Sequence, residues 1–343
     1  MVKRCYYFDI LNIIACLAVV AMHANSAFWD FRPSFSWLFN SFIEKACVWA
    51  VPIFFMLTGA TLIRSSESFS FCTYARRRFF RTVLPFIFWS VLGLIFDIYY
   101  LGLVSPDLKL TSYVSMIFNA AVPTTSVFWF FFPLFAIYLA LPLFISVEDG
   151  KKEKVFGYLI LSYLFFTLVK DLFSVLGASF PTELQLVALG GWLIYPVLGW
   201  YLSTVELRDD QRRAVYLIGM VSFCFAWGGT VVSSYKEGAI VNIGSNLLDL
   251  PYIFISISVF LFIKQRFAQV PLNERKVHLL VSLSSLTFGV YLTHRFVLNF
   301  IIKLFSVQVT VWYWPVIGFI VVSGFSFLLV LLFKRLPLLS RLL

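Results

Sequence analysis

Residues 6–29 read YYFDILNIIACLAVVAMHANSAFW, a run of mostly apolar residues that is long enough to cross a bilayer as one helix. Similar runs recur along the whole chain, at 46–63, 80–101, 127–147, 155–176, 185–204, 214–233, 247–265, 279–302 and 311–333. Each run is continuous rather than alternating, which excludes the strands of a membrane β-barrel. We therefore expect an all-α integral membrane protein, a single bundle of about ten transmembrane helices. The runs leave no room for a soluble domain, so one domain is expected to occupy residues 1–343.

The composition and the placement of charge agree with this class. Of the 343 residues, 61% are hydrophobic and 13% are charged, whereas soluble domains carry about 25% charged residues. The net charge of +10 raises the question of a nucleic-acid partner. If the N-terminus lies in the cytoplasm, however, most of the 27 lysines and arginines fall in the inner loops, as the positive-inside rule requires. The charge thus indicates a topology with both termini cytoplasmic, and it needs no nucleic acid.

The first run carries a polar stripe. His23 stands seventeen residues after Tyr6, which is about 25 Å along a helix. The steps from His23 back to three other residues are 7, 11 and 14 positions and nearly close whole helical turns, so one face also holds Cys16, Asn12 and Asp9. An imidazole at this depth is costly to bury and marks a candidate site. The alternative is a packing face held by side-chain hydrogen bonds.

The run at 279–302 contains a second candidate site. Tyr291 and His294 share one face of the expected helix. His294 is some fifteen residues from the inner end of this run, so we expect it at the depth of His23. The third histidine, His278, is expected at the inner surface, where water solvates it. Two imidazoles at matching depth in a membrane favour a functional site over simple packing.

Basic residues gather between the second and third runs, at the expected inner mouth of the bundle. They are Arg76, Arg77, Arg78 and Arg81. One interpretation is a positive-inside anchor. The other is a phosphate clamp, because a guanidinium group binds phosphate through two parallel hydrogen bonds. A cytoplasmic cofactor that carries a nucleotide would need such a clamp.

Other motifs indicate packing, and several signatures are absent. Pro52 and Gly59 suggest a kinked helix with a close backbone approach. Aromatic residues at 128–130 are typical of an interfacial belt, with a glycan-stacking platform as the alternative. The five cysteines form neither a CxxC pair nor a metal-ligand spacing, so we expect no metal site and no disulfide framework. The sequence contains no P-loop and no GxSxG motif.

Several of these segments, in their order, resemble the acyltransferase-3 family of membrane acyltransferases. The segments are Phe8-Asp9-Ile10-Leu11-Asn12 with His23, then 52–59, Arg76-Arg77-Arg78 with Arg81 and 82–89, Phe128-Trp129-Phe130, Leu189-Gly190-Gly191 with 198–201, and finally 285–294. The resemblance runs from residue 5 to about residue 335.

This resemblance implies transfer of an acyl group, usually acetyl, from cytoplasmic acetyl-CoA to a sugar hydroxyl, in the bacterial cytoplasmic (inner) membrane. The implied acceptor is a cell-surface polysaccharide, such as O-antigen or capsule, or its lipid-linked precursor. Three positions depart from the family's pattern. Asn12 stands where the family has an arginine, Phe128 follows Val127 where many members have His-Leu, and Arg295 stands where many have a proline after the histidine.

From the chemistry of these residues we expect His23 to act as the general base for the sugar hydroxyl, or to carry the acetyl group. The phosphates of CoA would dock on the basic cluster, and Asn12 would line the path of the cofactor arm. His294 and Tyr291 would position the acceptor or donate hydrogen bonds to the oxyanion. The expected partners are acyl-CoA, a glycan acceptor and membrane lipid.

Two other classes of function remain open. One is a polytopic transporter or flippase for a lipid-linked sugar, which would need a substrate cavity but no CoA site. The other is a non-catalytic relative that organises glycan assembly, and the missing arginine at position 12 keeps it open.

Overall fold

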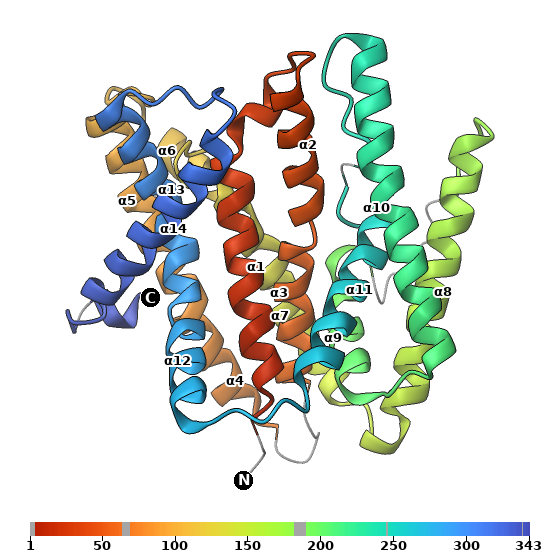
Figure 1. Cartoon of the computed structure of the whole chain (residues 1–343). Coiled ribbons are helices and arrows are strands. Elements are labelled where there is room, and N and C mark those ends of the chain that lie inside the picture. Colours follow the sequence, from red (N-terminus) through yellow and green to blue (C-terminus); the bar gives the residue numbers. More distant parts are fainter. Residues whose placement is uncertain (1–3, 64–68, 182–189, 245, 338) are drawn as a thin grey trace. The chain divides into compact units, whose positions relative to one another are not determined.

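A computed structural model describes residues 4–63, 69–181, 190–244, 246–337 and 339–343. Every regular element in these ranges is a helix, and nine of the helices described there are long and apolar enough to cross a membrane (Figure 1). The expected all-α integral membrane fold is confirmed. The expected span at 185–204 begins outside the described residues, where Leu189 also lies, and its described part is the short helix α9 (Ile194–Thr204). The cytoplasmic placement of the termini and the single domain stay predictions.

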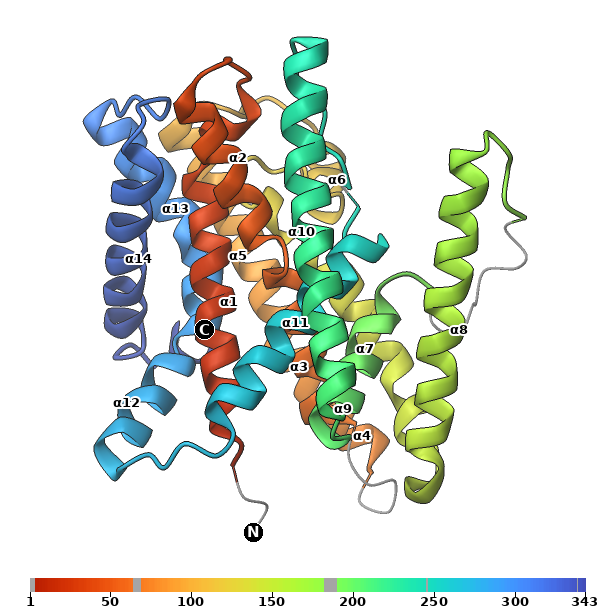
Figure 2. The same cartoon turned by 45° about the vertical axis from the view of Figure 1, so that its right-hand side comes forward.

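The chain divides into two compact units, which are described separately. The first comprises residues up to Ala18, Ala27–Phe69 and Leu139–Ser284. Its helices are α2 (Phe35–Cys47), α3 (Ala50–Leu62), α8 (Asp149–Val175), α9, α10 (Asp209–Glu237), α11 (Leu250–Phe267) and α12 (Glu274–Ser284), with the first part of α1 (Tyr6–Ala24) and the last part of α7 (Phe131–Ile145). Helices α10 and α11 lie side by side (Figures 1 and 2).

Glycines hold α3 and α9 together in this unit. A Cβ added at Gly59 would overlap the backbone carbonyl of Pro196, and one added at Gly199 would overlap that of Met56. The close backbone approach predicted from Gly59 is therefore confirmed. The expected span at 46–63 falls almost wholly within the candidate span Phe35–Leu62, which begins earlier and contains a short turn between the end of α2 at Cys47 and the start of α3 at Ala50. Pro lies in the first turn of α3, where its missing N–H costs no helical hydrogen bond.

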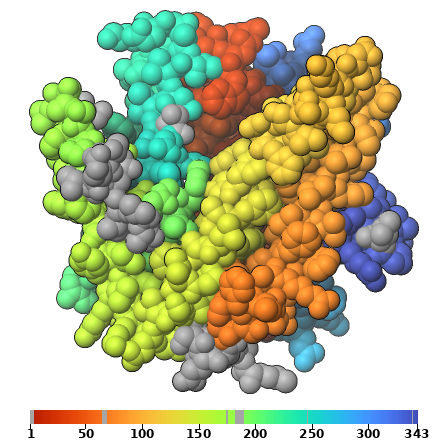
Figure 3. All heavy atoms as spheres, turned by 180° about the vertical axis from the view of Figure 1, so that it is seen from behind, coloured from red at the N-terminus to blue at the C-terminus, as the bar shows by residue number. Residues whose placement is uncertain are grey.

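The second unit comprises Val19–Ser26, Ser70–Tyr138 and Ser285–Leu343. Its helices are α4 (Phe71–Arg78), the π-helical turn η3 (Phe79–Val83), α5 (Leu84–Phe96), the π-helical turn η4 (Asp97–Leu101), α6 (Leu110–Phe118), the 3₁₀ turn η5 (Ser126–Phe130), α13 (Thr287–Phe305) and α14 (Trp314–Phe333). Helices α13 and α14 pack side by side (Figures 1 and 2). The orange segment from α4 to α5 lies on the face seen in Figure 3. Phe80 and Ile87 of this segment are exposed, and their apolar side chains are suited to lipid.

A proline explains the first π-helical turn. Pro85 has no backbone N–H, so the carbonyl of Arg81 loses its helical partner. The N–H of Leu84 donates instead to Phe79, five residues back. Such a turn inserts an extra residue and rotates the side chains before it relative to those after it.

The expected span at 279–302 is wrong in its bounds. The helix stops at Ser284 and α13 begins at Thr287. Clustered serines offer hydroxyl groups that compete for the backbone and disfavour a helix interior. Lys334 stabilises the break between the two helices, because its ammonium donates to the carbonyl oxygen of Ser285 at 2.8 Å and to its hydroxyl at 3.0 Å. Burial lowers the pKa of this lysine. His294 therefore stands seven residues into α13, about 10 Å from its start rather than deep in a longer helix.

Candidate active site

Two histidines contact each other in the second unit. His23, near the end of α1, places Nδ1 3.0 Å from Nε2 of His294 on α13. Their ring centroids are 5.0 Å apart, with 33° between the ring planes. The two imidazoles, which we expected at one depth, are in direct hydrogen-bond contact.

The partners of His294 determine where the protons lie. Its Nδ1 is 2.7 Å from the backbone carbonyl oxygen of Tyr291 and 3.2 Å from that of Val290. A carbonyl oxygen only accepts, so Nδ1 of His294 carries the hydrogen, and Nε2 of the neutral ring is an acceptor. The hydrogen between the two rings then belongs to Nδ1 of His23. The ring of His23 also has a hydrogen bond with the backbone carbonyl of Val19, one turn back on α1. With the hydrogen on Nδ1, Nε2 of the neutral ring carries the lone pair.

Burial assigns different roles to the two rings. The side chain of His294 is fully buried, whereas His23 is half-buried. The accessible ring is also the one whose Nε2 does not face the other imidazole. A base whose other nitrogen is held by a buried second group matches the geometry of activated bases in nucleophilic catalysis. Of the two rings, His23 is the less buried, and His294 is the one held by the backbone carbonyl of Tyr291.

Tyr291 has a structural contact that its sequence position did not predict. Its hydroxyl donates to the backbone carbonyl oxygen of Val127 in η5 at 2.6 Å. Three aromatic rings surround it, those of Phe128, Phe130 and Phe131. The single hydroxyl proton is used in this bond. Of the aromatic stretch at 128–130, Phe128 and Phe130 are buried and Trp129 is 37% exposed.

Asn12 and Asp9 have partners in the first unit. The amide of Asn12 donates to the carbonyl oxygen of Ser284 at 3.2 Å and to its hydroxyl at 3.1 Å. Asp9 is bound through two hydrogen bonds by Arg4, and this contact raises the pKa of the arginine. Asn12 is eleven residues before His23 on α1, about 16 Å along the helix. The structure thus places it at a helix contact, away from the base.

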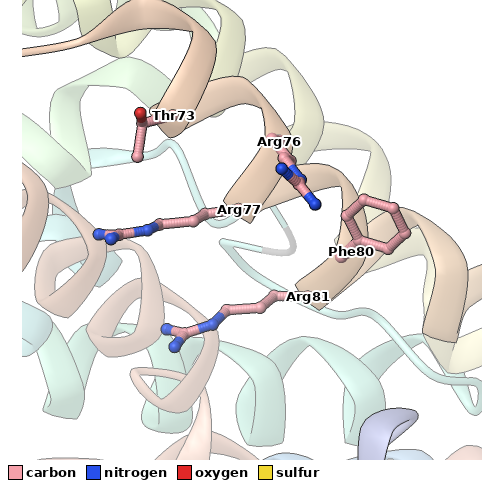
Figure 4. Close-up of a pocket in the computed structure, with 5 residues that line it drawn as sticks. All are labelled: Thr73, Arg76, Arg77, Phe80 and Arg81. Carbon is pink, nitrogen blue, oxygen red and sulfur yellow. The ribbon is translucent and has the colours of Figure 1, made fainter.

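Of the four arginines of the expected phosphate clamp, three line one cavity and the fourth contacts aromatic rings instead. Arg76, Arg77 and Arg81 line a cavity of about 410 Å³ together with Thr73 and Phe80, and Figure 4 shows Arg77 and Arg81 extending to the same side. Arg78 instead lies 5.5 Å from the ring of Tyr138 and 5.9 Å from that of Tyr74. These aromatic contacts are of cation–π type. The cavity therefore offers three guanidinium groups to an anion.

A buried polar cluster in the second unit escaped sequence analysis. Asp97, which begins η4, is fully buried and accepts the backbone N–H of Thr124 at 2.8 Å as well as the hydroxyl of the same residue. Asn299 on α13 donates to that hydroxyl oxygen at 3.0 Å. The available signal was a carboxylate near the end of an apolar run, and such charges are expensive in a membrane. Within the described ranges, no cluster of three or more His, Cys, Asp or Glu residues could hold a metal ion.

Comparison with known proteins gives one match. A family model described as an acyltransferase domain, of the acyltransferase-3 type, matches residues 6–333. A search of curated proteins and a search of solved structures found no match.

Proposed function

The chain belongs to the acyltransferase-3 family, and from this premise we propose that it is a membrane O-acetyltransferase. The donor in this proposal is cytoplasmic acetyl-CoA, and the acceptor is a hydroxyl of a cell-surface polysaccharide or of its lipid-linked precursor. The enzyme would work in the bacterial cytoplasmic membrane. The observation that carries the proposal is the contact of 3.0 Å between the two buried or half-buried imidazoles.

In the proposed reaction, His23 transfers the proton and His294 holds His23 in place. The acceptor hydroxyl gives its proton to Nε2 of His23 while its oxygen forms a bond to the thioester carbon. The tetrahedral intermediate then breaks its C–S bond, and the departing CoA thiolate takes the proton from Nε2 of His23, which returns the ring to its neutral form. Throughout, the Nδ1–H of His23 donates to His294, whose own Nδ1–H is anchored on the carbonyl of Tyr291. This chain orients the base and stabilises the imidazolium that forms.

The alternative route, in which His23 itself carries the acetyl group, uses the same lone pair. Nε2 would attack the thioester carbon, the thiolate would leave, and the acceptor oxygen would then displace the imidazole. The two routes differ in whether acetyl-His23 accumulates when acetyl-CoA is present without acceptor. Intact-protein mass spectrometry of that mixture distinguishes them.

The cavity at the basic cluster suits the phosphates of CoA. Three guanidinium groups line it, and phosphate is the anion that such forks bind best. The positive-inside rule places this cluster on the cytoplasmic side, where CoA is made. Arg78 is not part of this proposed site, because its guanidinium lies against two tyrosine rings.

The direct test uses purified protein with labelled acetyl-CoA and a glycan acceptor. His23→Ala should lower the rate of transfer by about 10²–10⁴-fold, which is the usual contribution of a positioned general base. His278→Ala is the matched control, because this third histidine is exposed on α12. Transfer by His23→Ala at more than about a tenth of the wild-type rate would refute the role of the base. A wild-type protein that moves a lipid-linked sugar without consuming acetyl-CoA would instead be a transporter.

A further inference from the structure

Arg295, the residue next to His294, has a guanidinium N–H that forms no hydrogen bond among the described residues. Arg295 follows His294 on α13 and is half-buried. Its Nε is buried, and the described part of the chain offers this atom no hydrogen-bond partner. A buried cation inside a membrane-spanning helix is expensive and is a functional candidate by default.

The nearby carboxylate does not use these donors. Asp97 takes its hydrogen bonds from the backbone N–H and the hydroxyl of Thr124. The charges of Arg295 and Asp97 act on each other through space, but among the described residues the two form no ion pair. Asp97 thus offsets part of the cost of the buried cation and leaves the Nε–H of Arg295 without an acceptor in the described ranges.

The other candidate donors of the site are already used. The hydroxyl proton of Tyr291 goes to Val127. The Nδ1–H of His294 goes to the carbonyl of Tyr291, and its Nε2 faces His23. An acyl transfer needs a donor for the charge that develops on the carbonyl oxygen. Of Tyr291, His294 and Arg295, the arginine is the residue that keeps an N–H, at Nε, without an acceptor in the part of the chain that the structure describes.

The placement of this cation has a further consequence. Arg295 lies within electrostatic reach of both imidazoles. A fixed positive charge opposes the formation of an imidazolium, so it is a poor neighbour for a base acting alone. The cost disappears if an anion forms next to the cation in the same step. A tetrahedral oxyanion arises at the moment when the base takes its proton.

We propose that Arg295 stabilises the oxyanion of acyl transfer. Its guanidinium would donate to the thioester carbonyl oxygen, strengthen that bond as negative charge develops there, and release the charge to sulfur when the C–S bond breaks. This inference rests on the proposed function. It replaces the earlier assignment of the oxyanion to Tyr291 and His294, whose donors are used elsewhere.

The kinetic test compares Arg295→Gln, Arg295→Lys and a matched control, Arg213→Gln, at an exposed arginine of α10. Arg295→Gln should lower kcat by about 10²–10³-fold, the usual effect of removing an oxyanion donor. The KM values for acetyl-CoA and for the acceptor should change little. Arg295→Lys should lose less, and Arg213→Gln should match wild type. An unchanged kcat in Arg295→Gln overturns the proposal, as does a raised acceptor KM at unchanged kcat, which would make Arg295 a binding group for an anionic acceptor.

Two further measurements guard against misfolding and against failure of the proposed function. Asp97→Asn combined with Arg295→Gln removes both buried charges, so we expect a folded but slow protein; a fast one overturns the proposal. The second readout is the infrared carbonyl frequency of a bound ketone analogue of acetyl-CoA, in which a methylene replaces the sulfur. We expect a shift to lower frequency in wild type that Arg295→Gln loses, and equal frequencies overturn the proposal. If the wild type transfers no acetyl group, the proposed function fails on its own, and the carbonyl frequency still decides the contact of Arg295.

Discussion

Replacing His294 measures how much its hydrogen bond to His23 contributes to kcat, apart from the contribution of His23 as the proposed base. In the neutral pair, Nε2 of His294 accepts the Nδ1–H of His23 across 3.0 Å. When His23 takes the proton of the acceptor, this hydrogen bond becomes one from a charged group, and such a bond contributes about 1.5–3 kcal/mol. The neutral bond already contributes about 0.5–1.5 kcal/mol before the reaction, so only the difference of about 1–1.5 kcal/mol acts on the rate. Since 1.36 kcal/mol is a factor of ten in rate, His294→Leu should lower kcat by about 5–13-fold. This loss is smaller than the loss expected when the base is removed.

A conservative variant tests whether the hydrogen bond is the cause. In His294→Gln the side-chain amide oxygen can stand near the former position of Nε2 and accept from His23. We therefore expect this variant to recover a large part of the rate that His294→Leu loses. A role in packing alone would follow the volume of the side chain and would show no such recovery.

The assay measures kcat and KM for acetyl-CoA in purified protein, with His278→Leu as the control on exposed α12. The double variant His23→Ala/His294→Leu should be no slower than His23→Ala, because residues that act as one unit are not additive. The reasoning is refuted if His294→Leu stays within about twofold of wild type, or if the two losses multiply in the double variant.

Two other predictions concern the arginine cluster and position 12. Replacing the three cavity-lining arginines with lysine should raise the KM for acetyl-CoA about tenfold, because the positive charge stays but the two parallel hydrogen bonds to phosphate are lost. The control Arg78→Lys should leave this KM unchanged. Equal effects of the two changes would make the cluster a simple anchor. Asn12→Leu should reduce activity moderately and lower the midpoint of thermal unfolding, because it removes the amide hydrogen bonds to Ser284, worth about 1 kcal/mol each. Asn12→Arg should keep activity. If Asn12→Leu matched wild type in both assays, position 12 would have no role.

The fold class and the candidate base could be read from the sequence because both depend on one-dimensional signals, although only the fold class is confirmed and the role of His23 stays a prediction. Continuous apolar runs predict membrane helices, and an imidazole in such a run stands out by its cost. The division of the arginine cluster could not be predicted, because the regular helix α4 ends at Arg78 and Arg81 lies within the π-helical turn η3. The extra residue of that turn changes which side chains share a face, and helical spacing alone assumes a regular helix.

The separate roles of the two histidines show a deeper limit of sequence reasoning. Their matching depth was predicted from a continuous helix over 279–302, and that helix is broken before Thr287. Their contact therefore arises from how α13 packs within its unit. The contact also depends on the carbonyl of Tyr291, a backbone atom that no residue pattern can reveal. Burial of one ring and partial exposure of the other then divide an apparently equivalent pair into a base and its support. Because this division follows from which nitrogen is already bonded, substitutions at the two positions should give unequal losses.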